Sequence, residues 1–139
     1  PGVATPVAAY VPAMVTGNLL FTAGQMPFVD GALAATGKVG GEVSVSEAAD
    51  LARICALNAL AAAKSVLGSL DRVTRVVKVN GFVASMPDFI GQPQVLNGAS
   101  EFLGEVFGDL GAHARAAVGV AVLPLDAPVE VELILEFSS

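Results

Sequence analysis

The chain of 139 residues has very few of the side chains on which metal-, cofactor- and thiol-dependent proteins rely. His113 is its only histidine and Cys55 its only cysteine, so no His/Cys cluster can ligate a metal ion and no disulfide can form within the chain. Neither a Gly-x-Gly-x-x-Gly motif nor a phosphate-binding loop is present. The sequence therefore predicts a site that uses no metal and no cofactor.

Charged residues are also scarce, at 14% of the chain, and the formal net charge is −6. Lys and Arg are scattered singly, which leaves no basic patch for nucleic acid or an anionic membrane. No apolar run approaches the roughly 18 residues that a membrane helix requires, and the first residues do not resemble a signal peptide. A lone cysteine suits a reducing compartment. We therefore expect a cytoplasmic protein that binds neither nucleic acid nor membrane.

What the chain has in abundance is apolar material, because 54% of its residues are hydrophobic. This is enough to build the core of one domain that spans residues 1–139. A soluble monomer with so few charges would expose large apolar patches, which soluble monomers rarely do. The composition therefore predicts an oligomer.

Hydrophobic periodicity predicts two helices and a sheet. Ser44 and Glu47 form a capping-box pattern before a helix that should end near Leu67, with Gly68 as its C-cap and Cys55 in the core. Strands or hairpins are expected at residues 13–15, 19–23, 28–33, 73–84, 113–124 and 129–137, and a second helix from Pro93 to about Phe107. This order, without a repeated βαβ unit, favours an α+β fold in which both helices cover one face of a mixed sheet.

The last two strands carry the most informative polar residues. Two-residue periodicity places Glu130, Glu132 and Glu136 on one face of the final strand, and Arg115 on a face of small residues in the strand before it. Small neighbours either admit a ligand or let another backbone approach. An unpaired buried charge is costly, so we expect Arg115 to have a partner, either Glu130 in a structural ion pair or a substrate carboxylate. The sequence leaves both alternatives open.

Three further residues have a structural and a functional interpretation. Tyr10 either pins an extended arm over residues 1–12 or lies beside a ligand, and Gly24 either ends a strand or lets a ligand approach the backbone. His113 is interpreted as a loop or interface residue, although its position two residues before Arg115 also allows it to support that side chain. Catalysis by the secondary amine of Pro1 is disfavoured.

Several motifs resemble, in order, those of the RidA/YjgF family of enamine/imine deaminases. They are Tyr10, Gly17-Asn18 with Ala23-Gly24-Gln25-x-Pro27, Val76-Val77-Lys78-Val79, Asp88-Phe89, Ala114-Arg115, Leu123-Pro124 and Val129-Glu130-Val131-Glu132. The resemblance implies a chorismate-mutase-like fold and a homotrimer with sites between subunits. It also implies hydrolysis of 2-imino acids to 2-keto acids and ammonia.

In that reaction the resemblance assigns a role to each candidate site residue. Arg115 would hold the substrate carboxylate, and Glu130 would orient water and shuttle a proton. Backbone groups near Ala117 and Gly24 would face the imine nitrogen, and Tyr10 and Asn97 would contribute to substrate binding. The alternative is a non-catalytic trimeric sensor that binds a small carboxylate in the same cleft.

The chain departs from the family pattern in two places. It has extra residues between Phe89 and Asn97, which bear on the alignment of Asn97. It also has Ala116 and Ala117 where many members carry Ser or Thr and then Cys. The surroundings His113-Ala114-Arg115 and Val118-Gly119-Val120 resemble a divergent branch of the family.

Overall fold

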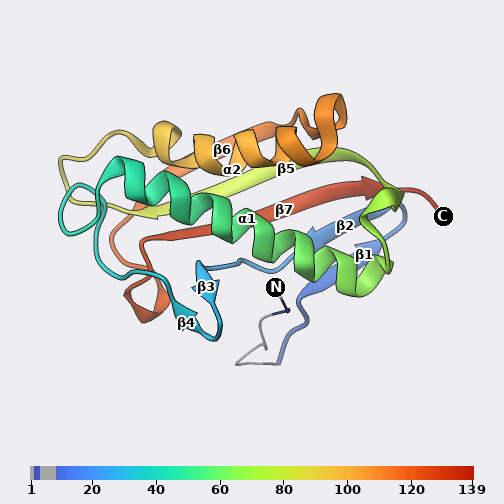
Figure 1. Cartoon of the computed structure of the whole chain (residues 1–139), viewed down its shortest axis with the longest axis horizontal. Coiled ribbons are helices and arrows are strands. Elements are labelled where there is room, and N and C mark those ends of the chain that lie inside the picture. The colour runs from blue at the N-terminus through green and yellow to red at the C-terminus, as the bar shows by residue number, and fades with distance from the viewer. Residues whose placement is uncertain (1, 4–8) are drawn as a thin grey trace.

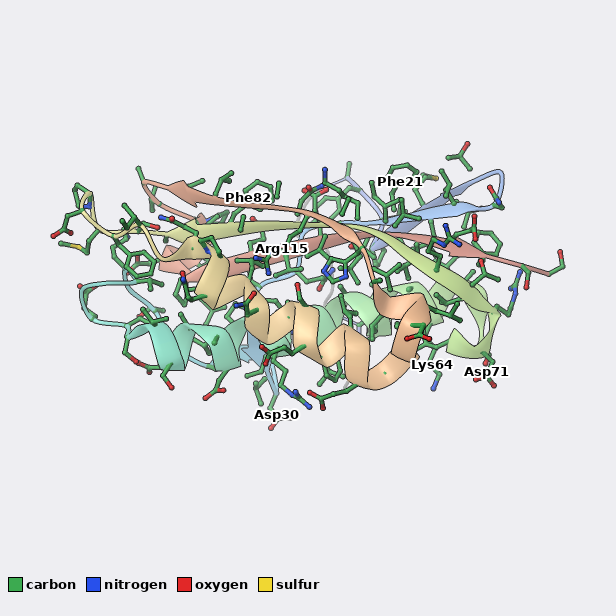
Figure 2. All side chains as sticks on the ribbon, turned by 90° about the horizontal axis from the view of Figure 1, so that it is seen from above. Phe21, Asp30, Lys64, Asp71, Phe82 and Arg115 are labelled. Carbon is green, nitrogen blue, oxygen red and sulfur yellow. The ribbon has the colours of Figure 1, made fainter. Side chains whose placement is uncertain are left out.

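The computed structural model, which describes residues 2, 3 and 9–139, has two helices packed on one face of its main sheet (Figure 1). Seen from above, the helices form one layer and the strands the other (Figure 2). The elements are β1 (Ala13–Thr16), β2 (Leu19–Thr22), β3 (Phe28–Val29), β4 (Ala32–Leu33), α1 (Val45–Leu67), β5 (Val73–Ala84), α2 (Gln92–Phe107), β6 (Ala114–Val120) and β7 (Val129–Phe137), with short 3-10 turns at Leu70–Arg72, Gly108–Gly111 and Pro124–Asp126. The predicted α+β architecture is confirmed.

The five-stranded sheet has the order β1-β2-β7-β5-β6, and β3 and β4 form a separate two-stranded sheet. Only β5 and β6 run parallel, because α2 connects them; the other neighbouring strands of the main sheet are antiparallel. The last strand in the chain, β7, therefore lies in the middle of the sheet, and β6 lies at its edge. The mixed sheet expected from the sequence is thus observed.

The ends of α1 show why the helix forms where the sequence predicted it. Ser44 accepts a hydrogen bond from the Glu47 backbone N–H at 3.1 Å, and the Glu47 carboxylate accepts one from the Ser44 N–H in return. Glu47 also lies at the positive end of the helix dipole. At the other end Gly68 has a φ of 84°, and its N–H donates to the Lys64 carbonyl. The capping box and the C-cap are both confirmed.

The core lies between the sheet and the two helices. Alternate residues of β5 and β7 face the helices and are fully buried, among them Val79, Val83, Val131 and Leu135. Gly81 lies on the same face, and a Cβ atom built there would be 2.1 Å from Leu96 Cδ1 of α2. The absence of a side chain at this position allows α2 to pack closely on the sheet.

The opposite face of the sheet carries no helix (Figure 2). Phe21 and Phe82 lie on this open face, together with Glu130, Glu132, Ile134 and Glu136 of β7. The predicted common face of the glutamates is therefore confirmed, and it is the uncovered one. Met14 and Phe21 of this face are 59% and 39% exposed, so the face is also partly apolar.

Within the described residues, no helix is long and apolar enough to span a bilayer. Half of the predicted N-terminal arm, namely Pro1 and residues 4–8, lies outside the residues that the structure describes. Tyr10 falls within them and is 51% exposed.

Candidate functional site

Arg115 lies at the edge of the sheet, on the face that the helices cover (Figure 2). It pairs with the buried Val79 in the parallel ladder between β5 and β6, and paired residues of neighbouring strands point to the same face. Its guanidinium reaches α2, where Nη1 donates to Asn97 Oδ1 at 2.9 Å and to Ser100 Oγ at 3.1 Å. Residues 97 and 100 are neighbours on the helix surface because they are three apart. One terminal nitrogen of Arg115 is thus held by two side chains of α2.

The small residues beside Arg115 serve the packing of α2. Ala117 packs against the core, and a Cβ atom at Gly119 would lie 2.8 Å from Gln92 Nε2 at the start of α2. Of the two explanations that the sequence offered for this small-residue face, the structure therefore supports the approach of another element.

Glu130 lies on the open face of β7. Phe82 of β5 is its cross-strand neighbour, and its carboxylate lies against Gly24. A Cβ atom at Gly24 would be 2.4 Å from Glu130 Oε2, so the close approach requires glycine at this position. Partial burial, with a smaller contribution from the charge of Glu132, raises the pKa of the Glu130 carboxyl above its ordinary value of 4.5.

The structure contradicts an ion pair between Arg115 and Glu130 within one chain. The two side chains lie on opposite faces of the sheet, and β5 runs between the strands that carry them. Ion pairs among the described residues join Lys38 to Asp126 and Arg53 to Glu105. The structural-pair alternative for Arg115 is therefore wrong for the single chain, because Arg115 uses neutral partners on α2 instead.

The backbone at Ala117 is accessible at the edge of the sheet. The Val120 carbonyl accepts a hydrogen bond from the Ser85 N–H, so the backbone groups of Val120 point toward β5. Since these groups alternate sides along a strand, those of Ala117 point away from β5, at the unpaired edge of β6. Ala117 can thus offer backbone donors and acceptors to a ligand without using its side chain.

The residues predicted from the sequence fall into two groups. One contains Arg115 with Asn97, and Ala117 lies two residues further along the same strand; the other contains Glu130 with Gly24. Despite the extra residues between Phe89 and Asn97, Asn97 reaches Arg115, and it does so as a hydrogen-bond acceptor. No hydrogen bond joins Tyr10 to either group within the described part of the chain.

Ser100, which is not among the residues predicted from the sequence, also contacts Arg115. Its hydroxyl lies 2.8 Å from His113 Nε2, and His113 Nδ1 lies 2.6 Å from the Gly111 carbonyl oxygen. The available signal was the three-residue spacing from Asn97 on a polar face of the predicted helix.

In the residues that the structure describes, no group of three His, Cys, Asp or Glu side chains comes together in a way that could hold a metal ion. A shallow groove between α1 and α2 is lined by polar side chains, including Asp50, Arg53 and Asn97. Arg53 is already engaged there with Glu105 at 2.9 Å.

Comparison with known proteins relates the chain to one family over nearly its full length. Residues 1–137 match the family described as "YjgF/chorismate mutase-like, putative endoribonuclease". Protein TCP17 of Trypanosoma cruzi is 44% identical over 140 residues, covering 100% of this chain and 88% of that protein.

Solved structures agree with this relationship. The protein Atu1372 of Agrobacterium tumefaciens, of unknown function, is 47% identical, with a TM-score of 0.93 over 97% of this chain and 87% of its own. TdcF of Escherichia coli, whose structure contains bound serine, is 26% identical, with a TM-score of 0.66 over 99% of this chain and 93% of its own. By sequence and by fold, the chain belongs to the RidA/YjgF family.

Proposed function

We propose that the protein is an imine deaminase that hydrolyses 2-imino acids to 2-keto acids and ammonia at a site between two subunits of a homotrimer. Arg115 binds the substrate carboxylate, and Glu130 of a neighbouring subunit orients and activates water. The proposal rests on the way Arg115 is held and on the environment of Glu130.

The observation that carries the proposal is the unused edge of the Arg115 guanidinium. A guanidinium has five N–H groups, and both of those on Nη1 have acceptors on α2. Nε and Nη2 have no acceptor among the described residues, yet no buried polar side-chain atom there lacks a partner. Within the described part of the chain Nε and Nη2 are therefore not buried, and they form a planar pair of donors that matches the two oxygens of a carboxylate.

The separation of Arg115 and Glu130 supports a site between subunits. One chain cannot bring both side chains to the same small ligand, because the sheet lies between them. The open face exposes Met14, Phe21 and Val118, which favours its burial against another copy of the chain. In a closed ring, the β6 edge of one subunit would meet the open face of the next.

The chemistry asks for a carboxylate anchor and a group that moves protons. Water attacks C2 of the protonated imine while Glu130 accepts a proton, which gives a tetrahedral amino alcohol. Glu130 then protonates the amino group, the C–N bond breaks, and the hydroxyl proton passes through Glu130 as the keto group and ammonia form. A carboxyl group whose pKa is raised suits both the base step and the acid step.

The backbone can replace the side chains that this branch lacks. Ala116 points to the open face and Ala117 toward the core. As alanines, neither offers a hydroxyl or a thiol. The backbone of Ala117 at the sheet edge remains available to the reacting nitrogen or to the carboxylate. This supports a site in which the loss of Ser/Thr and Cys is tolerated.

The alternative is a sensor that binds a small carboxylate without turnover. The serine bound to TdcF, a relative at 26% identity, favours binding of a small amino-acid-like molecule and is compatible with both functions. An endoribonuclease is less well supported, since the open face carries three glutamates and the chain a net charge of −6, both of which repel phosphates.

The test is turnover of an imine generated in place by an amino-acid oxidase, measured with the wild type, with Arg115→Lys and with Arg53→Lys. The first substitution keeps the charge but loses the planar pair of donors, and we expect the rate at limiting substrate to fall about tenfold or more. Arg53→Lys makes the same change at an exposed residue of α1, away from the open face of the sheet, and should leave the rate unchanged.

An unchanged rate in Arg115→Lys would contradict the assigned role. Wild-type protein that binds pyruvate saturably and hydrolyses no imine would favour the sensor. Cleavage of RNA that depends on Glu130 would favour the endoribonuclease.

A further inference from the structure

His113 and Ser100 form a chain of hydrogen bonds that ends on Arg115. The Gly111 oxygen can only accept, so His113 Nδ1, 2.6 Å away, carries the hydrogen. In the neutral ring, Nε2 is then an acceptor, and the Ser100 hydroxyl donates to it over 2.8 Å. With its hydrogen committed to His113, Ser100 presents lone pairs to Arg115 Nη1 at 3.1 Å.

This arrangement fixes the direction of the serine hydroxyl. A hydroxyl rotates freely unless a partner holds it, and an O–H that pointed at the guanidinium would oppose a donor with a donor. His113 prevents this, because it provides the acceptor for the hydroxyl hydrogen. Ser100 thereby becomes an acceptor dedicated to Arg115.

Two acceptors are needed to set the rotation of a guanidinium about its long side chain. Asn97 Oδ1 takes one Nη1 hydrogen and Ser100 Oγ takes the other, from positions three residues apart on α2. With both in place, the plane of the guanidinium is fixed and the edge formed by Nε and Nη2 faces away from α2. With Asn97 alone, the group can pivot about a single hydrogen bond.

We propose that Ser100, held by His113, is a positioning residue that turns the Nε–Nη2 edge of Arg115 outward for a two-point contact with a planar carboxylate. This inference rests on the proposed role of Arg115 in substrate binding. It assigns to the lone histidine a role that requires no proton transfer to substrate. Binding by the pre-set edge avoids the cost of ordering a long side chain when the ligand arrives.

The test measures pyruvate binding by calorimetry, together with KM and kcat for imine hydrolysis. Ser100→Ala should raise the dissociation constant for pyruvate, and KM with it, by about fivefold to tenfold, while kcat changes less than about twofold. Alanine has a higher helix propensity than serine, which favours folding of this variant. Ser100→Thr keeps the hydroxyl and should restore most of the affinity.

A matched control is Ser65→Ala, which removes another helix hydroxyl, one that donates to the Ala62 carbonyl at 2.6 Å in α1. It should change neither the dissociation constant nor KM. His113→Ala should weaken pyruvate binding in the same direction as Ser100→Ala. The double variant should bind no worse than Ser100→Ala alone, because His113 acts through Ser100.

The outcomes separate this inference from the proposed function. If Arg115→Lys weakens pyruvate binding but Ser100→Ala does not, Arg115 binds the carboxylate and the positioning role is wrong. If the double variant adds the two single effects in full, His113 acts independently of Ser100, which also contradicts the inference. If Arg115→Lys binds pyruvate as the wild type does, the proposed site itself fails.

Discussion

Arg115 and Glu130 lie on opposite faces of the same sheet, with β5 between the strands that carry them. Their separation gives the first prediction, which concerns trimers assembled from two kinds of chain. If each site takes Arg115 from one subunit and Glu130 from the next, co-expressed Arg115→Lys and Glu130→Gln chains should have intact residues at about one quarter of their sites. Activity per chain should rise to about that fraction of the wild-type value.

The control for this experiment co-expresses wild-type chains with chains that carry both substitutions. A site shared by two subunits again gives about one quarter of the wild-type activity, whereas a site within one chain gives about one half. The mixture of single variants would then give only the residual activity of each variant measured alone. The ratio of the two mixtures therefore decides the arrangement without reference to an absolute rate.

The second prediction concerns the pH dependence of stability. Burial raises the pKa of Glu130, so the folded protein favours its protonated form. The contribution of Glu130 to the free energy of unfolding is fully present below its ordinary pKa of 4.5. It is lost as the pH rises through the raised pKa of the folded state. Glu130→Gln should therefore melt at a higher temperature than the wild type at pH 7, and the difference should vanish toward pH 4.

The same variant should lose the proton-transfer step, with a fall in kcat of about 10²–10⁴-fold. Thermal melts and rates over this pH range check both effects. A lower melting temperature at pH 7 would show instead that a cation lies opposite Glu130 in the assembled protein.

The third prediction concerns Gly24, whose lack of a side chain leaves room for the Glu130 carboxylate. Gly24→Ala would place a Cβ atom 2.4 Å from Glu130 Oε2, which must move away. We expect activity to fall on the order of 10- to 100-fold, because small displacements of a reacting group have effects of this size. Combining Gly24→Ala with Glu130→Gln should cost no more than Glu130→Gln alone, and a fully additive loss would contradict this interpretation.

The fourth prediction compares two glycines. Gly81→Ala would bring a Cβ atom 2.1 Å from Leu96 Cδ1 in the packed core and should destabilise the protein by about 1–3 kcal/mol. At Gly104 a Cβ atom would meet no other part of the protein within 4 Å, so Gly104→Ala should stabilise α2 by about 0.5–1 kcal/mol. Denaturant unfolding of the two variants measures both, and equal effects would show that the Gly81–Leu96 contact does not limit packing.

Much of the fold could be predicted because its signals are local. The capping pair of Ser44 and Glu47, the glycine after Leu67 and the shared face of the glutamates each depend on residues a few positions apart, and the structure confirms them. Asn97, which the family resemblance assigned to substrate binding, is exposed on α2.

Whether Arg115 and Glu130 lie on the same face of the sheet depends on the turn between their strands. Hydrophobic periodicity does not predict the conformation of that turn. Alternation orders the residues within β6 and within β7, but the face that each set takes depends on the path of residues 121–128. Leu125 and Asp126 have φ values of 60° and 58° there, a conformation that side-chain patterns do not predict for these residues. The role of Ser100 could not be predicted for a related reason, since its partners His113 and Arg115 are 13 and 15 residues away in the sequence.

The division of the site across the sheet ties catalysis to assembly. In the proposed trimer, a newly made chain has one half of a site on its β6 edge and the other half on its open face, and neither works alone. Specific activity would then follow the law of mass action, falling on dilution below the trimer dissociation constant and returning on concentration. Degradation of unassembled chains would remove only inactive protein.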